Sequence, residues 1–182
     1  MSLGEWADLD PEIDGELVDG ALEAEEMPSI IHETIVAFIL GLLRTWLVPR
    51  GGFALGSEVK LAVSSRRGRK ADVVAYLPGA PRPGGRDKLV RVPPTILVEV
   101  ITDTPRDARR DRIEKAAEYA AFGVRYYWLV DPEARTLEVF ERTRSKKWSR
   151  TVAAATGKVQ VPGCGGLTLD LDKMWREVDD VL

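Results

Sequence analysis

The sequence contains very little of the two side chains that most often build zinc and redox sites. Cys164 is the only cysteine and His32 the only histidine among its 182 residues. A single cysteine excludes a disulfide framework and a multi-cysteine zinc site, and one histidine beside it argues against His-rich and zinc-dependent catalytic sites. Walker, Gly-x-Gly-x-x-Gly and Gly-x-Ser-x-Gly motifs are also missing, so nothing indicates nucleotide, dinucleotide or acyl chemistry.

Signals for secretion and membrane insertion are missing as well. The acidic N-terminus has no basic region followed by an apolar one, so we expect no signal peptide. The most apolar window, residues 30–48, contains His32, Glu33 and Arg44, which makes it a poor membrane span. Apolar residues make up 45% and charged residues 30% of the chain, which is an ordinary globular composition. We expect one cytoplasmic domain over residues 1–182, without membrane contact.

The net charge of −3 is unevenly distributed along the chain. Residues 1–43 hold eleven Asp or Glu and no Lys or Arg, which leaves 26 basic and 18 acidic side chains, a net charge of +8, in the other 139 residues. Clustered Lys and Arg can neutralise phosphates even in an acidic protein, although such clusters can equally be solvated turns and helix faces. The distribution therefore permits DNA as a partner, through the candidate nucleic-acid-binding residues Arg66, Arg67, Arg69 and Lys70. The other basic clusters are Arg106, Arg109, Arg110 and Arg112, and Arg142, Arg144, Lys146, Lys147 and Arg150.

Hydrophobic spacing and turn residues indicate an α/β sheet domain. The dipeptide Asp19-Gly20 suits the tight turn of a β-hairpin over residues 16–23. Ser29 is a suitable N-cap for a first helix, and Gly123 is suitable for the end of a second. We expect helices over residues 29–48 and 107–122, with a short one from 172. We expect strands over residues 53–61, 71–76, 95–101, 126–130, 136–142, 148–154 and 167–169, with a basic turn over 66–70 and a loop over 78–94.

Two carboxylates interrupt otherwise apolar strands. Asp72 lies within Ala-Asp-Val-Val-Ala-Tyr, and Glu99 lies within Ile-Leu-Val-Glu-Val-Ile. An ionised carboxylate in an apolar strand is costly unless it is paired, protonated or bound to a metal. Hard cations such as Mg²⁺ prefer carboxylate oxygens, so these two side chains on neighbouring strands, with one backbone carbonyl, would form a metal site. The alternative is that each carboxylate pairs with a nearby arginine.

Several short motifs follow one another along residues 15–142, and together they resemble a known family. They are Glu16-Leu17-Val18-Asp19-Gly20, Pro28-Ser29 with His32, Arg69-Lys70-Ala71-Asp72-Val73-Val74, Leu97-Val98-Glu99-Val100, Arg109-Arg110-Asp111 with Lys115 and Tyr119, and Gly123-Val124 followed by Tyr127-Trp128-Leu129-Val130-Asp131-Pro132. This set resembles the Uma-type putative restriction endonucleases, a bacterial branch of the PD-(D/E)XK nuclease superfamily. The resemblance implies a restriction-endonuclease-like fold, in which helices flank a mixed β-sheet core. The C-terminal strands and the short helix of residues 143–182 lie beyond the matching motifs.

The resemblance also implies which residues bind metal. In that superfamily an Asp and a second Asp or Glu bind the cation, while a lysine positions or activates the attacking water. Asp72 and Glu99 would therefore be catalytic ligands of Mg²⁺ or Mn²⁺, helped by the carbonyl of Val100. Ala71 replaces the proline of the usual motif, which removes a stiff residue but no functional group.

The superfamily lysine is displaced in this sequence, because Ile101 stands where it should be. The resemblance implies that the lysine has moved onto the following helix, which makes Lys115 the catalytic lysine. On that helix Lys115 lies nearly opposite an apolar stripe formed by Ile113, Ala116, Ala117, Ala120 and Ala121. Lys115 and Tyr119, one turn apart, would face the cleft beside Glu99 while the alanines pack on the sheet. The alternative is a solvated lysine that pairs with Asp111.

His32, Glu33, Glu16 and Tyr119 are accessory candidates for the same site. His32 could orient a water or a carboxylate, although a lone helical histidine is more often structural or exposed. Glu33 or Glu16 could add a carboxylate near the metal. The expected function is a magnesium-dependent DNA endonuclease, most easily a homodimer if it cuts both strands. The alternative is a catalytically inactive nuclease fold that binds DNA or protein.

Overall fold

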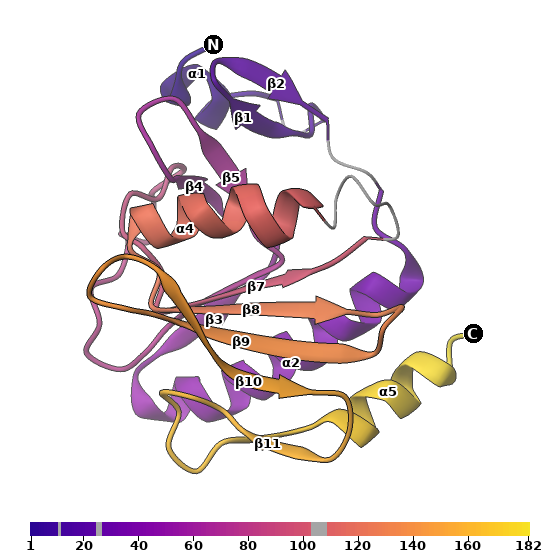
Figure 1. Ribbon diagram of the computed structural model, residues 1–182. Coiled ribbons are helices and arrows are strands. Elements are labelled where there is room, and N and C mark those ends of the chain that lie inside the picture. The colour runs from indigo at the N-terminus through magenta and orange to yellow at the C-terminus, as the bar shows by residue number, and fades with distance from the viewer. Residues whose placement is uncertain (11, 25–26, 103–108) are drawn as a thin grey trace.

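A six-stranded mixed sheet lies at the centre of the structure (Figure 1), a computed structural model that describes residues 1–10, 12–24, 27–102 and 109–182. The strand order is β10-β9-β8-β7-β6-β3, in which β7 and β8 are parallel and the other neighbours are antiparallel. Its strands are β3 (Phe53–Leu55), β6 (Val73–Tyr76), β7 (Ile96–Val100), β8 (Tyr126–Asp131), β9 (Thr136–Arg142) and β10 (Trp148–Ala154).

A second, smaller sheet with the order β2-β1-β5-β4 lies above the central sheet in Figure 1. Its strands are β1 (Glu16–Val18), β2 (Ala21–Glu23), β4 (Lys60–Ala62) and β5 (Gly68–Lys70), and a separate pair is formed by β11 (Lys158–Gln160) and β12 (Thr168–Asp170). The helices are α1 (Leu3–Ala7), α2 (Ile30–Leu47), the 3₁₀ turn η1 (Val48–Arg50), the π-helical turn η2 (Arg110–Lys115), α4 (Ala116–Phe122) and α5 (Leu171–Asp179). This mixed sheet with flanking helices confirms the expected fold class.

The parallel strands β7 and β8 form the middle of the central sheet because they are apolar on both faces. All five residues of β7 are buried, and so are the first five of β8. Alternate side chains supply two separate cores: Val98 and Trp128 pack into one, and Leu97 and Tyr127 pack into the other. Strands buried on both faces read as continuous apolar runs, so Glu99 of β7 is the exception that requires a partner.

Helix α2 covers one face of the central sheet and contacts α5. The side chain of Ser29 accepts a hydrogen bond from the backbone N–H of His32, which confirms it as the N-cap. By length and composition, residues 30–50 are apolar enough to cross a membrane, with a mean hydropathy of 1.6. The inner face of α2, however, belongs to the core, where Ile35 and Ile39 are fully buried.

Most predicted strands are confirmed, but the region between α2 and β6 differs from the prediction. Residues 53–61 are not one strand, because β3 pairs with β6 in the central sheet while β4 pairs with β5 in the smaller one. The predicted basic turn over 66–70 contains β5. The predicted hairpin is present, and Asp19 and Gly20 adopt the positive φ values of 49° and 92° that its turn requires. Helix α1 and strand β11 have no counterpart among the predicted elements.

The predicted helix over residues 107–122 is formed by η2 and α4, which lie between the two sheets in Figure 1. It ends as predicted at Gly123, whose φ is 116°. Residues 107–108, and Arg106 of the second basic cluster, lie outside the described residues. The predicted apolar stripe is partly wrong, because Ile113 is 60% exposed and Ala117 and Ala121 are exposed too. The helix instead turns Lys115 inward, toward buried carboxylates.

We expect Gly68→Ala to destabilise the fold, because a methyl group at this position would overlap the fully buried ring of Trp6. Overpacking a closed core costs about 1–3 kcal/mol in the free energy of unfolding. The matched control is Gly41→Ala on the exposed side of α2, where a methyl group would meet nothing within 4 Å. That change should stabilise the helix by roughly 0.5–1 kcal/mol. Urea denaturation measures both, and a loss of the same size in each would contradict the packing argument.

Candidate active site

Strand pairing brings Asp72 and Glu99 together. Val73 pairs with Val98 in the antiparallel ladder of β6 and β7, so the residue before Val73 lies opposite the residue after Val98. Directly opposite residues of an antiparallel pair have their side chains on one face of the sheet. Asp72 and Glu99 accordingly line one cavity of about 120 Å³ at the carboxyl end of β7.

Asp72 is held by a backbone amide and by the only histidine. Its Oδ2 accepts a hydrogen bond of 2.7 Å from the backbone N–H of Val100 and lies 3.3 Å from Nε2 of His32. Nδ1 of His32 lies 3.4 Å from Oε1 of Glu33, which is largely exposed. Burial alone would lower the pKa of His32, but the hydrogen bond to Asp72 and the charges of Asp72 and Glu33 outweigh it and raise the pKa. The first turn of α2 therefore supplies a histidine whose protonated form Asp72 stabilises.

Glu99 is buried among polar partners rather than paired with an arginine. The hydroxyl of Tyr119 donates a hydrogen bond of 2.6 Å to Oε1 of Glu99, and Nζ of Lys115 lies 3.3 Å from the same oxygen. Burial raises the pKa of Glu99 well above its ordinary range; Lys115 opposes this rise, and three nearby carboxylates add to it. As predicted, Lys115 and Tyr119 both face Glu99 from one side of the helix.

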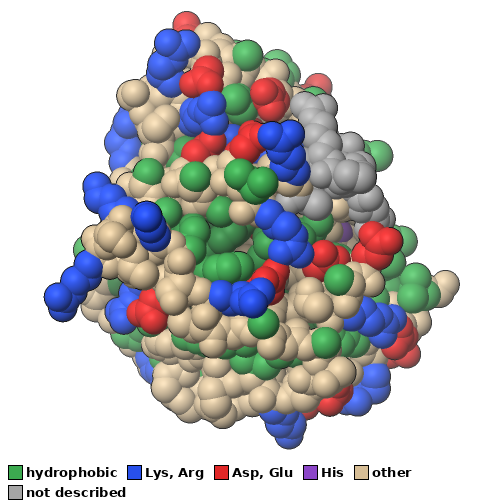
Figure 2. Space-filling model, viewed as in Figure 1, with side chains coloured by type: hydrophobic (Ala, Val, Ile, Leu, Met, Phe, Trp, Pro, Cys, Tyr) green, Lys and Arg blue, Asp and Glu red, His purple; other side chains and the backbone are tan. Residues whose placement is uncertain are grey.

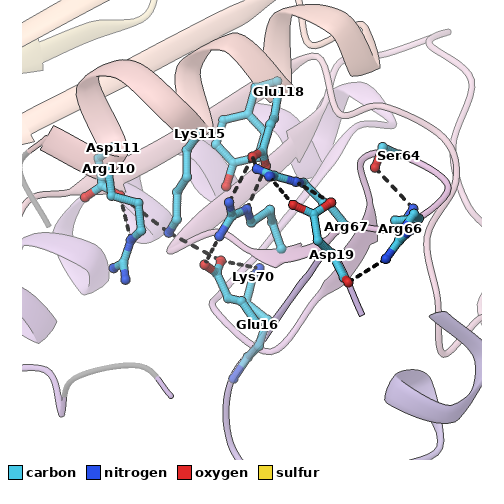
Figure 3. Close-up of polar contacts among 12 residues, drawn as sticks. Glu16, Asp19, Ser64, Arg66, Arg67, Lys70, Arg110, Asp111, Lys115 and Glu118 are labelled. Carbon is cyan, nitrogen blue, oxygen red and sulfur yellow. Dashed lines mark hydrogen bonds and ion pairs between the residues drawn. The ribbon is translucent and has the colours of Figure 1, made fainter. Parts of the chain in front are cut away.

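The ammonium group of Lys115 is surrounded by three carboxylates. Its Nζ lies 3.3 Å from Oε1 of Glu16, 3.3 Å from Oε1 of Glu99 and 3.5 Å from Oδ1 of Asp111. Figure 3 shows Glu16 and Asp111 on either side of this lysine. Burial alone would lower the pKa of Lys115, but the charges of Glu99, Glu16 and Asp111 outweigh it and raise the pKa above its ordinary value. The alternative of a solvated lysine is therefore wrong, and the group stays protonated.

Asp111 lines the cavity as well, although it is not among the predicted site residues. It is 4% exposed, and its Oδ1 accepts no hydrogen bond from the described residues. Burial raises its pKa against the opposing charge of Lys115. The spacing of four residues from Lys115 was the available signal, but it indicated a surface pair. The π-helical turn η2 instead directs both side chains inward, and such turns are frequent at functional sites.

A buried network of ion pairs fixes Glu16 from behind (Figure 3). The guanidinium of Arg69 donates one hydrogen bond of 2.8 Å to Oε2 of Glu16 and another of 2.7 Å to Oε2 of Glu118. The backbone N–H of Lys70 donates to the other oxygen of Glu16 at 3.0 Å. Arg69 and Glu16 are each 1% exposed. The prediction that Arg69 contacts nucleic acid is therefore wrong, because its guanidinium is enclosed and its donors are taken by carboxylates.

The other residues of the predicted basic cluster are also partly neutralised. Arg67 pairs with Asp19 and with Glu118, and Nζ of Lys70 lies 2.6 Å from Asp14. Arg66 is exposed, and its guanidinium donates to the backbone carbonyl of Asp19. Figure 2 shows Lys and Arg interleaved with Asp and Glu on the face it presents, without one continuous basic patch. Lys70 also lines the site cavity, which leaves it and Arg66 as the candidates of this cluster that a phosphate could approach.

The donors around the cavity fit a hard divalent cation. Asp72, Glu99 and Val100 all line it and offer carboxylate and carbonyl oxygens. The carboxylate repulsion that helps raise the pKa of Glu99 would be relieved by a cation. In the described part of the chain, no three His, Cys, Asp or Glu side chains are arranged to hold a metal. Two carboxylates suffice for Mg²⁺, which usually keeps several waters.

Comparisons with known proteins agree with this fold. The family model Uma2, described as putative restriction endonuclease, matches residues 3–172. Among solved structures, the chain is similar to a putative nuclease belonging to DUF820 from Anabaena variabilis, with a TM-score of 0.77 and 17% sequence identity. The match covers 98% of this chain and 99% of that one. No curated protein matches the sequence.

We expect Arg69→Met to lower the free energy of unfolding by about 3–5 kcal/mol, because it removes the buried guanidinium that Glu16 and Glu118 share. The matched control is Arg150→Met, which breaks the exposed pair with Glu138 and should cost at most about 1 kcal/mol. Chemical denaturation at neutral pH measures both. If Arg69→Met lowered the free energy of unfolding by less than Arg150→Met does, Arg69 would not support the site.

Proposed function

This chain belongs to the Uma2 family of putative restriction endonucleases, and we propose that it is a magnesium-dependent nuclease that hydrolyses the phosphodiester bonds of DNA. One observation carries the proposal. Asp72 and Glu99, from adjacent strands, meet Lys115 from the following helix at one cavity at the end of the central sheet. Two carboxylates for a cation and one ammonium for an anion are what phosphodiester hydrolysis requires.

The side chains of Asp72 and Glu99 and the carbonyl of Val100 would hold Mg²⁺, or Mn²⁺ in its place. Bound there, the cation would acidify the attacking water and neutralise charge on the phosphate oxygens. The chain's own contacts keep these ligands in position. His32 and the N–H of Val100 fix Asp72, and Tyr119 fixes Glu99. His32 and Tyr119 thus act on the ligands rather than on the substrate, and Glu33 contacts His32.

Lys115 would contribute a positive charge and hydrogen bonds, not a base. Its three carboxylate neighbours keep the amine protonated, so it has no lone pair with which to accept a proton from water. A cation that draws Glu99 toward itself would release the N–H that Lys115 now directs at Glu99. That N–H would donate to a phosphate oxygen, on which negative charge builds as water attacks phosphorus and the bond to the leaving oxygen breaks. Glu16 and Asp111 set the direction of that donor.

Contacts to the rest of the DNA would come from lysine and arginine side chains that lie outside the buried ion pairs. Lys70 lines the cavity, where its ammonium pairs with Asp14. Arg66 is exposed, and so are Arg144, Lys146 and Lys147 in the turn after β9. Binding through such residues weakens steeply with salt because it releases counterions from the phosphates. A two-fold homodimer would place two such sites on opposite strands.

A second candidate function is a nuclease fold that binds DNA or protein without cutting. Its support is that two side chains, rather than three, converge as metal ligands among the described residues, and that Lys115 is already paired with carboxylates. In that case the cavity would remain a structural cluster of charges.

We expect millimolar Mn²⁺ to raise the melting temperature, and expect Asp72→Asn and Glu99→Gln each to abolish that rise. Each change removes one anionic ligand while keeping the side-chain shape. The control is Glu177→Gln on the exposed side of α5, which should keep the full Mn²⁺ response. A wild-type protein that is indifferent to Mn²⁺ would remove the metal site.

We expect Lys115→Met to retain metal binding but to lower the nicking rate on supercoiled plasmid by roughly 10²-fold, a typical loss for one charge-stabilising donor. Lys115→Arg should not restore the rate, since its planar guanidinium does not fit among three carboxylates arranged around a compact ammonium. Lys173→Met on the exposed face of α5 is the control and should cut at the wild-type rate.

Asp72→Asn should be inactive in the same assay. Circular dichroism at the assay temperature identifies any variant that has unfolded. Equal cutting by all variants would point to a contaminating nuclease, and no metal-dependent cutting by the wild type would leave the non-catalytic function in its place.

A further inference from the structure

A second cavity, of about 480 Å³, adjoins the candidate active site and has no part in the mechanism above. The two cavities share His32 and Thr102 in their walls. A phosphate at Asp72 and Glu99 would therefore have this space beside it. Because a nucleic-acid strand is continuous, the nucleotide next to that phosphate is the part of the substrate that would lie in this space.

The cavity lies where this type of fold commonly binds ligands. It opens beyond the carboxyl ends of the parallel strands β7 and β8, where Ile101 and Pro132 follow the last strand residues. Open sheets bind ligands in the crevice outside the carboxyl ends of their strands. The N-terminus of α2, an 18-residue helix, supplies another wall through Ser29 and Ile31. Free N–H groups and the helix dipole at such an end favour an anion.

The walls of the cavity combine apolar and polar side chains. Ile31, Ile101 and Val178 form apolar sides, and the thioether side chain of Met27 is 94% exposed at the rim. Glu133 and Arg135 lie among the polar groups. A nucleobase has flat apolar faces and a polar edge, so it matches this combination better than a sugar or a free phosphate does. Covering Met27 would also remove an exposed apolar side chain from water.

We propose that this cavity receives the base of the nucleotide next to the scissile phosphate, turned out of its stack, with that nucleotide's phosphate at the N-terminus of α2. The proposal rests on the proposed nuclease function, because the nuclease places a strand beside the cavity. The base is held between Ile31 and Ile101, and its contacts add binding energy close to the reacting bond.

The test is the binding of short single-stranded deoxyoligonucleotides to the full chain in Ca²⁺, followed by fluorescence anisotropy. One probe carries a base at every position, and a second has an abasic site in the middle. Wild type should bind the first roughly tenfold more tightly, as expected for burying the faces of one base against aliphatic side chains. Ile31→Trp, which fills the cavity, should remove this preference. Met27→Asp, at a side chain that is 94% exposed and so makes no demand on folding, should weaken it.

The matched control is Thr45→Trp, which places an indole in a separate cavity of about 600 Å³ at the other end of α2 and should keep the preference. Equal binding of both probes by wild type overturns the base site even if plasmid nicking is normal. A preserved preference without nicking supports the base site while removing the hydrolytic function. Failure to bind either probe overturns both.

Discussion

The buried ammonium of Lys115 is the charge on which the architecture of the site depends. A charged group with 4% of its side chain exposed is tolerable only with partners around it. Those partners come from three parts of the chain: Glu16 in β1, Glu99 in β7 and Asp111 in η2. Because one lysine joins both sheets and the helix between them, the placement of any one of these elements constrains the others.

The N-terminal segment supports the site through the same kind of interaction. Arg69 is enclosed between Glu16 and Glu118, so the helix carrying Lys115 and the strand carrying Glu16 are tied together on a second side. Other acidic residues of the segment pair with the basic cluster, as Asp14 does with Lys70 and Asp19 with Arg67. The acidic N-terminus and the basic cluster, which look like separate features in the sequence, therefore neutralise each other.

This pairing explains which parts of the fold and site the sequence reveals. Asp72 and Glu99 can be identified as site candidates from the sequence because each interrupts an apolar run. The register of β6 and β7 then places them together. The burial of Arg69 cannot be predicted from the sequence. Arg69 stands among other basic residues in a polar stretch, and the carboxylates that enclose it are distant in sequence. The inward direction of Lys115 is predicted by the family resemblance and not by periodicity, because the alanines of its helix suggest a different buried face. Local periodicity reports apolar burial, whereas buried ion pairs depend on tertiary contacts.

The balance of charge also connects structure with the proposed activity. Asp72, Glu99 and Asp111 line the cavity together with Lys70, Arg110 and Lys115, and the carboxylate of Glu16 contacts Lys115. Acidic side chains outnumber lysines and arginines in the cavity lining, and burial, together with the neighbouring carboxylates Asp72 and Asp111, raises the pKa of Glu99. A phosphodiester approaching that cluster would be repelled, because like charges at close range in a poorly solvated site interact strongly. A divalent cation would reverse the local charge, so in this site it would serve substrate binding before it serves any step of hydrolysis.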